Sequence, residues 1–334
     1  MASCDQSPIF ITAEALHNTL SFKALIQHFH TTLPSAASTV ESPSRQCFPV
    51  SPASALLLMP SWSSSPCLPY IGVKLVTYFP NNSNLNLPGV NASYALFSSS
   101  TGQTLASMDG TRLTLYRTAC ISGLASKLLS RNDSKVLIMV GAGALAPYLI
   151  RAHLAARPSL ERVIVWNRTG RKADDLVQKL KQEELGHGGL CFETHRDLDS
   201  VIPLGDIVSC ATNSEVPLVK GGKLKAGAHL DLVGSFKETM KECDDEAIRR
   251  GKVVVDNEAA LHEAGEIVGA LRREVIGRGD VGFLVDVIGG DRSGRRGGHE
   301  EDITVFKSVG SAVVDLLAAQ LVYETYMANN CTIR

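Results

Sequence analysis

Cationic side chains stand among apolar neighbours in the N-terminal part of the sequence, at Arg45, Lys74, Arg112 and Arg117. An arginine can bind a carboxylate through two parallel hydrogen bonds, and a lysine is a proton donor whose pKa shifts readily on burial. Any one such residue is more often a solvated surface charge. Together they favour a site for a small carboxylate, although the alternation around Lys74 leaves open whether the strand directs it into a cleft or into water.

The stretch VLIMVGAGALAPYLI, residues 136–150, has the residue types of a nucleotide-binding turn. In such a turn the first glycine permits a tight bend, the second lets backbone N–H groups approach a pyrophosphate, and a third small residue lets helix and strand pack closely. A helix that begins there adds N–H groups and a positive dipole end. The flanking strand and helix patterns favour cofactor binding over a purely structural turn. The residues concerned are Gly141, Ala142, Gly143, Ala144, Leu145 and Ala146.

The strand-like stretch RVIVWN, residues 162–167, indicates which cofactor would bind. An NAD site usually ends this strand with Asp or Glu, whose carboxylate accepts a hydrogen bond from the ribose 2′-hydroxyl. This sequence places Asn167, Arg168 and Thr169 there, and Arg168 can bind a 2′-phosphate. We therefore expect NADPH, with NADH as the weaker alternative. The other interpretation of Arg168 is a solvated loop charge.

Hydrophobic periodicity predicts the elements that would position these residues. From about residue 119 to 304 short apolar strands alternate with helices, which predicts an α/β fold with a parallel sheet covered on both faces. Strands are expected at 135–140, 162–167, 191–194, 206–212, 229–234 and 252–256. The stretch from 302 is expected to start a long helix to about Met327. This helix is apolar on all sides, so it must pack against the first region or a second subunit.

The region before residue 119 mixes helix and strand signals. A helix is expected over 12–30, capped by Thr12. Strands are expected at 55–59, 71–79, 94–98 and 104–108, the last two forming an antiparallel hairpin. Pro and Ser crowd residues 34–69, which predicts loops.

Composition describes an ordinary soluble globular protein. A chain of 334 residues suggests two domains, and hydrophobic content of 44%, charged content of 20% and a net charge of −1 give no attraction for nucleic acid or an anionic membrane. The eight cysteines are scattered without metal-ligand spacing, so we expect no metal and a reduced, intracellular compartment. The first residues lack an apolar run and leave little room for a separate transit peptide, which favours the cytosol.

Several stretches, in the same order, resemble the ornithine cyclodeaminase/mu-crystallin family over nearly the whole chain. They are PSRQCFP (43–49), LLMP (57–60), GVKLVTYFPNN (72–82), TGQTLASMDGTRLTLYRTACISGLAS (101–126), VGAGALA (140–146), VGSF (233–236) and DITVFKSVGSAVVD (302–315). The resemblance implies a Rossmann-like NADP-binding domain at 119–304. It also implies a discontinuous α+β substrate-binding and dimerisation domain at 1–118 with 305–334, and a homodimer.

The same resemblance implies roles for individual residues. Arg45, Lys74 and Arg117 fall on the family's substrate-carboxylate positions, and Met59 and Ser308 are further expected substrate contacts. Cofactor contacts are implied at Thr118, Gly141, Ala142, Gly143, Ala144, Leu145, Ala146, Asn167, Arg168, Thr169, Thr212, Asn213 and Val309.

Within the family the sequence looks most like the plant ketimine reductases that form pipecolate. This implies NADPH-dependent reduction of Δ1-piperideine-2-carboxylate, with Δ1-pyrroline-2-carboxylate, which would give proline, as a smaller analogue. Arg45 and Arg117 are expected to hold the carboxylate so that the imine carbon faces the nicotinamide. Lys74 is the candidate proton donor, unless it is only a further carboxylate contact, and Asp231 is the fallback acid. Plant relatives further imply lysine catabolism, plant defence and a plastid location, against the cytosol that the N-terminus favours.

Two alternatives from other classes stay open. The cyclodeaminases of the family carry a GGDCPGK-type segment, and Phe236 stands here where its Asp would be. A phenyl ring can neither hold an ammonium nor act as a base, so a cyclodeaminase (a lyase) is the weaker interpretation. The other alternative is a non-catalytic protein of mu-crystallin type that binds NADPH and a small ligand.

Overall fold

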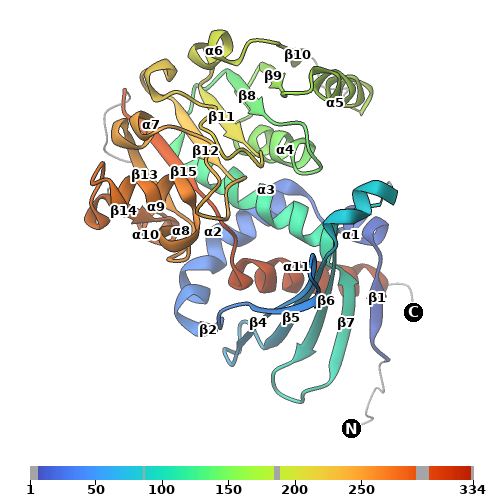
Figure 1. The fold of residues 1–334 in the computed structure, drawn as a ribbon. Coiled ribbons are helices and arrows are strands. Elements are labelled where there is room, and N and C mark those ends of the chain that lie inside the picture. Colours follow the sequence, from blue (N-terminus) through green and yellow to red (C-terminus); the bar gives the residue numbers. More distant parts are fainter. Residues whose placement is uncertain (1–6, 86, 184–188, 291–300, 332–334) are drawn as a thin grey trace. The chain divides into compact units, whose positions relative to one another are not determined.

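The computed structural model describes residues 7–85, 87–183, 189–290 and 301–331 (Figure 1). The chain divides into two compact units: a discontinuous unit of residues 1–117 and 311–334, and a central unit of residues 118–310. The sequence placed the second boundary at 304/305, whereas the central unit continues to Gly310 because its sheet includes a strand over Ile303–Lys307. The α/β fold class predicted from the sequence is confirmed.

The central unit contains an eight-stranded sheet in which every neighbouring pair of strands is parallel. In the order of the sheet the strands are β10 (Cys191–Thr194), β9 (Arg162–Trp166), β8 (Val136–Val140), β11 (Ile207–Cys210), β12 (His229–Leu232), β15 (Ile303–Lys307), β13 (Gly251–Val255) and β14 (Val281–Phe283). The first five follow the Rossmann order 3-2-1-4-5. From β8 the chain adds strands toward one edge of the sheet, and from β11 it adds them toward the other edge, so the order switches between β8 and β11. Loops after these two strands are where a dinucleotide binds in such sheets.

Helices connect these strands. They are α4 (Ala146–Ala156), α5 (Gly170–Glu183), α6 (Leu198–Val201), α7 (Asp245–Arg250), α8 (Ala260–Glu263), α9 (Gly265–Arg272) and α10 (Leu284–Gly289), with short 3-10 turns at Ile202–Leu204, Gly221–Lys223 and Arg278–Asp280. The middle strands are buried along their whole length, as expected for a sheet with both faces covered.

The expectation of a helix from residue 302 is wrong for its first part. Residues Ile303–Lys307 form β15, a fully buried strand between β12 and β13. A short apolar run has the same pattern in a buried strand and in a buried helix, so periodicity alone does not separate them. Gly310, at φ 82°, separates this strand from helix α11 (Ala312–Cys331).

The discontinuous unit is built on a seven-stranded sheet. Its order is β1 (Ile9–Ile11), β7 (Thr104–Asp109), β6 (Val90–Ser98), β5 (Tyr70–Tyr78), β4 (Ser54–Ser63) and β2 (Val40–Glu41), with β3 (Gln46–Ser51) also paired to β4. The β1–β7 pair is parallel and the other pairs are antiparallel, which confirms the hairpin predicted over 94–108. Strand β3 lies in the stretch predicted as loops, and all of its residues are exposed, so it carries no inward–outward pattern.

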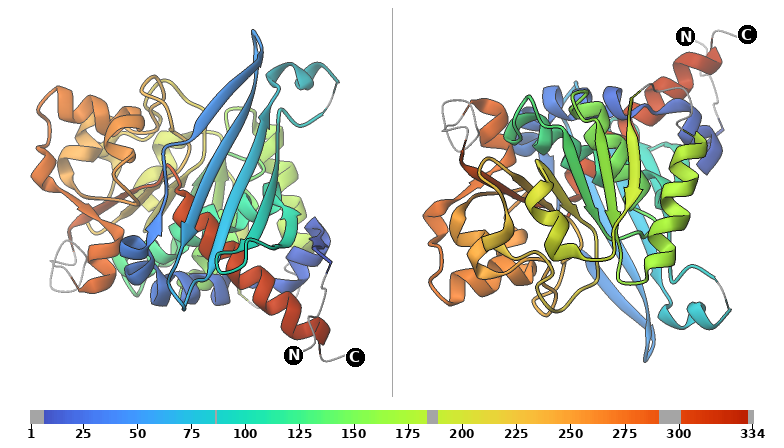
Figure 2. Two further views of the ribbon diagram at one scale, coloured as in Figure 1. Left: turned by 90° about the horizontal axis from the view of Figure 1, so that it is seen from below. Right: turned by 90° about the horizontal axis from the view of Figure 1, so that it is seen from above.

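Helices pack on one face of this sheet. They are α1 (Ala13–Thr19), α2 (Phe22–Thr39), the start of α3 (Gly110–Leu129) and α11, and a 3-10 helix follows β5 at Pro80–Leu85. Helix α11 contacts α2 and crosses β4 and β5 (Figure 2, left). The predicted cap Thr12 is confirmed, because its side chain accepts from Ala15 N at 3.1 Å. The single helix expected over 12–30 is two helices: Leu20 is extended and Ser21 caps α2. Within the described part of the chain, no helix combines the length and apolarity that a bilayer crossing requires.

Candidate functional site

Lys74 is directed into the covered face of the discontinuous unit. On the pleated sheet it lies opposite Met59 of β4 and Tyr94 of β6, and α11 packs across this part of the sheet. Its side chain is only 5% exposed, and its Nζ lies 2.6 Å from Oδ2 of Asp315. The structure therefore answers the question that alternation left open, because Lys74 is not a solvated surface charge.

Asp315 joins Lys74 to Arg117. Nε of Arg117, on α3, lies 2.8 Å from Oδ1 of Asp315, on α11, and these two side chains are 9% and 1% exposed. The Arg117 contact is an ion pair without an aligned hydrogen bond. One buried carboxylate thus faces two buried cations. Sequence reasoning missed Asp315 as a site residue, although an acidic residue in a helix apolar on all sides is a usable signal, since buried charges are paired.

Arg45 acts on Lys74 through its charge. Arg45 is exposed, in the segment that precedes β3. Burial lowers the pKa of Lys74 to about 8; the carboxylate of Asp315 acts against this, while the charges of Arg117 and Arg45 lower it further. Burial alone would raise the pKa of Asp315, but attraction to Arg117 and Lys74 outweighs it and the pKa lies below its ordinary value. The structure thus brings Lys74 and Arg117 together at one carboxylate, and the charge of Arg45 is felt at Lys74.

Tyr94, Met59 and Arg112 lie near these cations in the chain or the sheet, and they differ in burial and in hydrogen bonding. Tyr94 is fully buried, and burial together with the charge of Asp315 raises its pKa, so the hydroxyl stays neutral. Met59 is half-buried beside Lys74. Arg112 lies in the first turn of α3, where its backbone N–H donates to Oδ1 of Asp109 at 2.6 Å.

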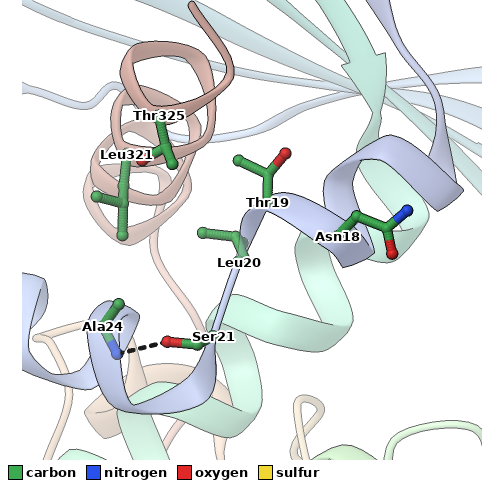
Figure 3. A pocket seen from close by; sticks show the side chains of 7 residues that line it. All are labelled: Asn18, Thr19, Leu20, Ser21, Ala24, Leu321 and Thr325. Carbon is green, nitrogen blue, oxygen red and sulfur yellow. Dashed lines mark hydrogen bonds between the residues drawn. The ribbon is translucent and has the colours of Figure 1, made fainter. Parts of the chain in front are cut away.

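A shallow pocket of about 180 Å³ lies elsewhere in the discontinuous unit, where residues 18–21 and 24 meet Leu321 and Thr325 of α11 (Figure 3). Leu20 points toward α11, and the hydroxyl of Ser21 accepts from Ala24 N. None of the lining side chains is charged. The pocket therefore lacks a cation that could pair with a carboxylate.

The glycine turn of the central unit has the shape that a pyrophosphate requires. Gly141 has φ 110°, and a Cβ there would lie 2.6 Å from the carbonyl oxygen of Ala211. Gly143 is exposed, and nothing stands within 4 Å of the position its Cβ would take. Helix α4 begins at Ala146 with no side chain capping its N-terminus. Open backbone at a helix start is a good fit for a dinucleotide. Ala144 is exposed and Leu145 half-buried in the same turn.

Asn167 connects the end of β9 to this turn. Its Oδ1 accepts from Ala142 N at 3.2 Å, and its Nδ2 donates to the carbonyl of Thr169 at 2.9 Å. Arg168 and Thr169 are both exposed. The end of the second strand therefore presents a guanidinium where an NAD site usually has a carboxylate.

Glu242 fixes the loops after β11 and β12, and the sequence did not reveal it. This fully buried carboxylate accepts from Thr212 N at 2.7 Å, from Thr212 Oγ1 at 3.0 Å and from Gly234 N at 2.6 Å. Burial raises the pKa of Glu242, and the charge of Lys307 opposes the shift. Asn213, next to Thr212, is exposed.

Asp256, at the end of β13, accepts hydrogen bonds from the loop after β15 and so holds that loop in place. Its Oδ2 accepts from Ser308 Oγ at 2.7 Å, Val309 N at 3.1 Å and Gly310 N at 2.8 Å. Ser308 is buried and Val309 is half-buried. Thr118, on α3, is 8% exposed. The expected cofactor residues of the central unit thus lie mainly in loops that follow strands, and the carboxylates of Glu242 and Asp256 hold three of these loops.

Asp231 and Phe236, which the sequence also singled out, lie in different environments: Asp231 is in the core and Phe236 is on the surface. Asp231 lies inside β12, fully buried, where Ser209 Oγ donates to it at 2.7 Å and His153 Nε2 lies 3.2 Å away. This core network leaves Asp231 no access to a substrate. Phe236 follows β12 and is 43% exposed, with Nζ of Lys237 5.5 Å from its ring centre.

Residues 6–330 match the ornithine cyclodeaminase/mu-crystallin family. Protein SAR DEFICIENT 4 of Arabidopsis thaliana is 62% identical over 322 residues, which cover 96% of this chain and 98% of that protein. A Δ1-pyrroline-2-carboxylate reductase of Colwellia psychrerythraea is 36% identical and covers 94% and 98% of the two chains. The solved Δ1-pyrroline-2-carboxylate reductase of Thermococcus litoralis, in complex with NADH and L-proline, superimposes with a TM-score of 0.88 at 30% identity, covering 96% of this chain and 98% of that chain. The family predicted from the sequence is confirmed.

Proposed function

The chain belongs to the ornithine cyclodeaminase/mu-crystallin family, and from this premise we propose that it is an NADPH-dependent reductase of cyclic ketimine carboxylates. The observation that carries the proposal is the buried pair of Lys74 and Arg117, two cations that share the single carboxylate of Asp315. The charge of Arg45 also acts on Lys74. The relatives of this chain include reductases of a cyclic imino acid, which act on a C=N bond. In this assignment the discontinuous unit binds the substrate and the central unit binds the cofactor.

Arg117 and Arg45 bind the substrate carboxylate. Asp315 contacts Nε of Arg117, so a carboxylate would pair with the two terminal nitrogens of the guanidinium. Arg45 is exposed and supplies the outer charge. Such a pairing fixes the ring of the substrate, and positioning of this kind is worth up to about 7–11 kcal/mol of a reaction barrier. Met59 and Ser308 complete the proposed substrate contacts.

Lys74 delivers the proton. With a pKa of about 8, its ammonium form predominates at neutral pH, yet it gives up a proton more readily than an ordinary lysine. A bound nicotinamide would supply the hydride for the imine carbon. The π-electron pair of the C=N bond then belongs to nitrogen, where the proton from Lys74 forms the N–H bond. Lys74 is left neutral and regains its proton from water.

The central unit has the groups that would hold a dinucleotide. The backbone of 141–146 and the start of α4 would bind the pyrophosphate, and Asn167, Arg168 and Thr169 would surround the adenosine phosphate. Thr212, Asn213, Thr118 and Val309 would contact the remaining parts. Arg168 supports NADPH over NADH. Replacing Arg168 by Ser should raise the KM for NADPH at least tenfold and change that for NADH little; equal changes for both would refute the preference.

We assign Δ1-piperideine-2-carboxylate, reduced to pipecolate, as the preferred substrate and Δ1-pyrroline-2-carboxylate as the smaller one. The test offers each imine with NADPH or NADH to the purified protein and follows the nicotinamide absorbance. Faster turnover of the five-membered ring would overturn the ring-size assignment and leave the reductase. A lyase would instead release ammonia from ornithine without net cofactor oxidation, and a binding protein would retain NADPH without turnover. Phe236 supports the reductase over the lyase, because its ring cannot handle an amine.

A homodimer is part of the proposal. The face of the sheet opposite α11 carries apolar side chains that are well exposed, including Phe48 at 47%, Trp62 at 40% and Leu75 at 38%. In the register of the sheet, Leu58 lies opposite Leu75, and Ile71 opposite Trp62. Exposed apolar patches of this kind mark protein interfaces, and a second copy of the chain would cover them. Leu75→Lys should then convert a dimer to a monomer in light scattering.

The plastid location, and roles in lysine catabolism and plant defence, also remain proposals. They are supported by the likeness to plant ketimine reductases. Imaging the whole chain with a fluorescent protein at its C-terminus separates plastid from cytosol.

A further inference from the structure

The carboxylate of Asp315 lies where three elements meet. It is in the first turn of α11, it contacts Lys74 of β5 through Oδ2 at 2.6 Å, and it contacts Arg117 of α3 through Oδ1 at 2.8 Å. Its own backbone N–H donates to the carbonyl of Ser311 at 3.2 Å, which fixes the start of the helix. Each carboxylate oxygen thus has its own cation, and the two oxygens set the spacing of the ammonium and the guanidinium.

We propose that Asp315 is a positioning residue of the C=N reduction, which holds the Lys74 ammonium and the Arg117 guanidinium side by side for one substrate. This inference rests on the proposed function, since it assigns these two cations to the substrate. Asp315 itself does not touch the substrate; it acts through Lys74 and Arg117.

The charges around Lys74 explain why a carboxylate is needed. Burial, Arg117 and Arg45 all lower the pKa of Lys74, and among the groups that shift it Asp315 is the one that raises it. Tyr94, which faces Lys74 from β6, stays neutral and supplies no negative charge. Met59, which faces it from β4, does not titrate. Without the carboxylate, repulsion from Arg117 would be unopposed, and Lys74 would lose its proton more readily.

Removing the charge of Asp315 should shift the pH dependence of kcat to lower pH. Reduction uses the protonated form of Lys74, so the rate falls as the pH rises through its pKa. In Asp315→Asn that pKa drops, so the decline should move to lower pH by at least one unit. At pH 8 we expect kcat to fall at least about fivefold, because the protonated fraction of Lys74 falls from about one half to about one tenth. The KM for the imine should rise, because Arg117 loses its partner, while the Kd for NADPH should stay within twofold.

A second variant changes the spacing while keeping the charge. Asp315→Glu extends the carboxylate by one methylene in a buried site, so we expect a raised KM and a kcat reduced at least tenfold, with the high-pH decline near that of the wild type. Glu324→Gln is the matched control, because Glu324 is an exposed carboxylate on the same helix that accepts from Tyr70. It should retain the wild-type kcat, KM and pH profile.

The experiment measures kcat and KM across pH 6–10, thermal unfolding, and binding of pyridine-2-carboxylate, an unreactive planar ring acid, to each protein with NADP+. The expected result is binding at least tenfold weaker in Asp315→Asn than in the wild type. A lower melting temperature with an unmoved pH profile in Asp315→Asn, or wild-type kcat and KM in Asp315→Glu, would overturn the inference. If Asp315→Asn does not fold, Asp315→Glu decides alone. A wild type that binds the acid but reduces neither imine counts against the proposed function, whereas the binding comparison still decides the part played by Asp315.

Discussion

Two glycines of the same turn should respond in opposite ways to one added methyl group. At Gly143 a Cβ meets nothing within 4 Å, so Gly143→Ala should leave the folded apoprotein unstrained. The open space is where a pyrophosphate would approach the backbone, so the methyl group should instead obstruct the cofactor. At Gly141 the residue has φ 110° and a Cβ would lie 2.6 Å from a backbone oxygen, so Gly141→Ala should strain the protein itself.

The magnitudes follow from these contacts. Overpacking by one methyl group costs about 1–3 kcal/mol, and tenfold in Kd corresponds to about 1.4 kcal/mol, so Gly143→Ala should weaken NADPH binding roughly 5- to 150-fold. For Gly141→Ala, a left-handed backbone costs about 1–2 kcal/mol, and the clash with backbone adds about 1–3 kcal/mol, so the free energy of unfolding should fall by about 2–5 kcal/mol.

Thermal unfolding without cofactor and titration of NADPH fluorescence separate the two effects. Gly143→Ala should keep the wild-type melting temperature and lose affinity, while Gly141→Ala should lose melting temperature. Gly222→Ala is a control, because a Cβ there also meets nothing within 4 Å and the residue lies in the 3-10 turn at Gly221–Lys223. Wild-type NADPH affinity in Gly143→Ala would refute the assignment of this turn to the cofactor.

Three other outcomes are expected. With a Lys74 pKa of about 8, kcat at saturating substrate should be high at pH 7 and decline through pH 8 to 9. Lys74→Gln should lose most of the activity and also this decline. If Lys74→Gln keeps the same decline, the decline belongs to another group. Gly72→Ala should lower the free energy of unfolding by about 1–3 kcal/mol in denaturant titrations, since its Cβ would stand 2.0 Å from Tyr94 Oη, and an unchanged midpoint would contradict the packing. Glu242→Gln replaces a charged acceptor of three hydrogen bonds by an amide, so it should lower the free energy of unfolding by about 1–3 kcal/mol and weaken NADPH binding. Wild-type affinity in this variant would show that the Thr212 loop is not needed for cofactor binding.

The parts of the fold that depend on local pattern were predictable. The glycine turn, the strands of the parallel sheet and the hairpin at 94–108 each follow from spacing within a short window. Strand β15 was misjudged because its pattern suits either element type, and its place in the sheet depends on β12 and β13, which lie far away in the sequence. Its neighbours, and not its own residues, decide its structure.

The candidate site shows the same limit at the level of side chains. The residue types of Arg45, Lys74 and Arg117 suggested a carboxylate site, but their orientation did not follow, since alternation predicts two faces without saying which is covered. Asp315 and Lys74 are 241 positions apart, so their contact exists only in the fold. Glu242 and Asp256 were missed for a related reason: each binds backbone N–H groups, which every loop has and no sequence motif marks.

Buried ions alone do not mark a functional site, and this chain contains its own comparison. In the central unit Lys307 is fully buried 3.0 Å from Glu266, and its charge also acts on Glu242, so one cation balances two carboxylates. In the discontinuous unit the balance is reversed, because the two buried cations Lys74 and Arg117 face the single carboxylate of Asp315. Burying ions costs several kcal/mol each and is often no better for stability than apolar packing, so an unbalanced cationic group needs a reason other than stability. An anionic substrate would supply the missing charge at Lys74 and Arg117, whereas the acidic excess around Lys307 would repel it.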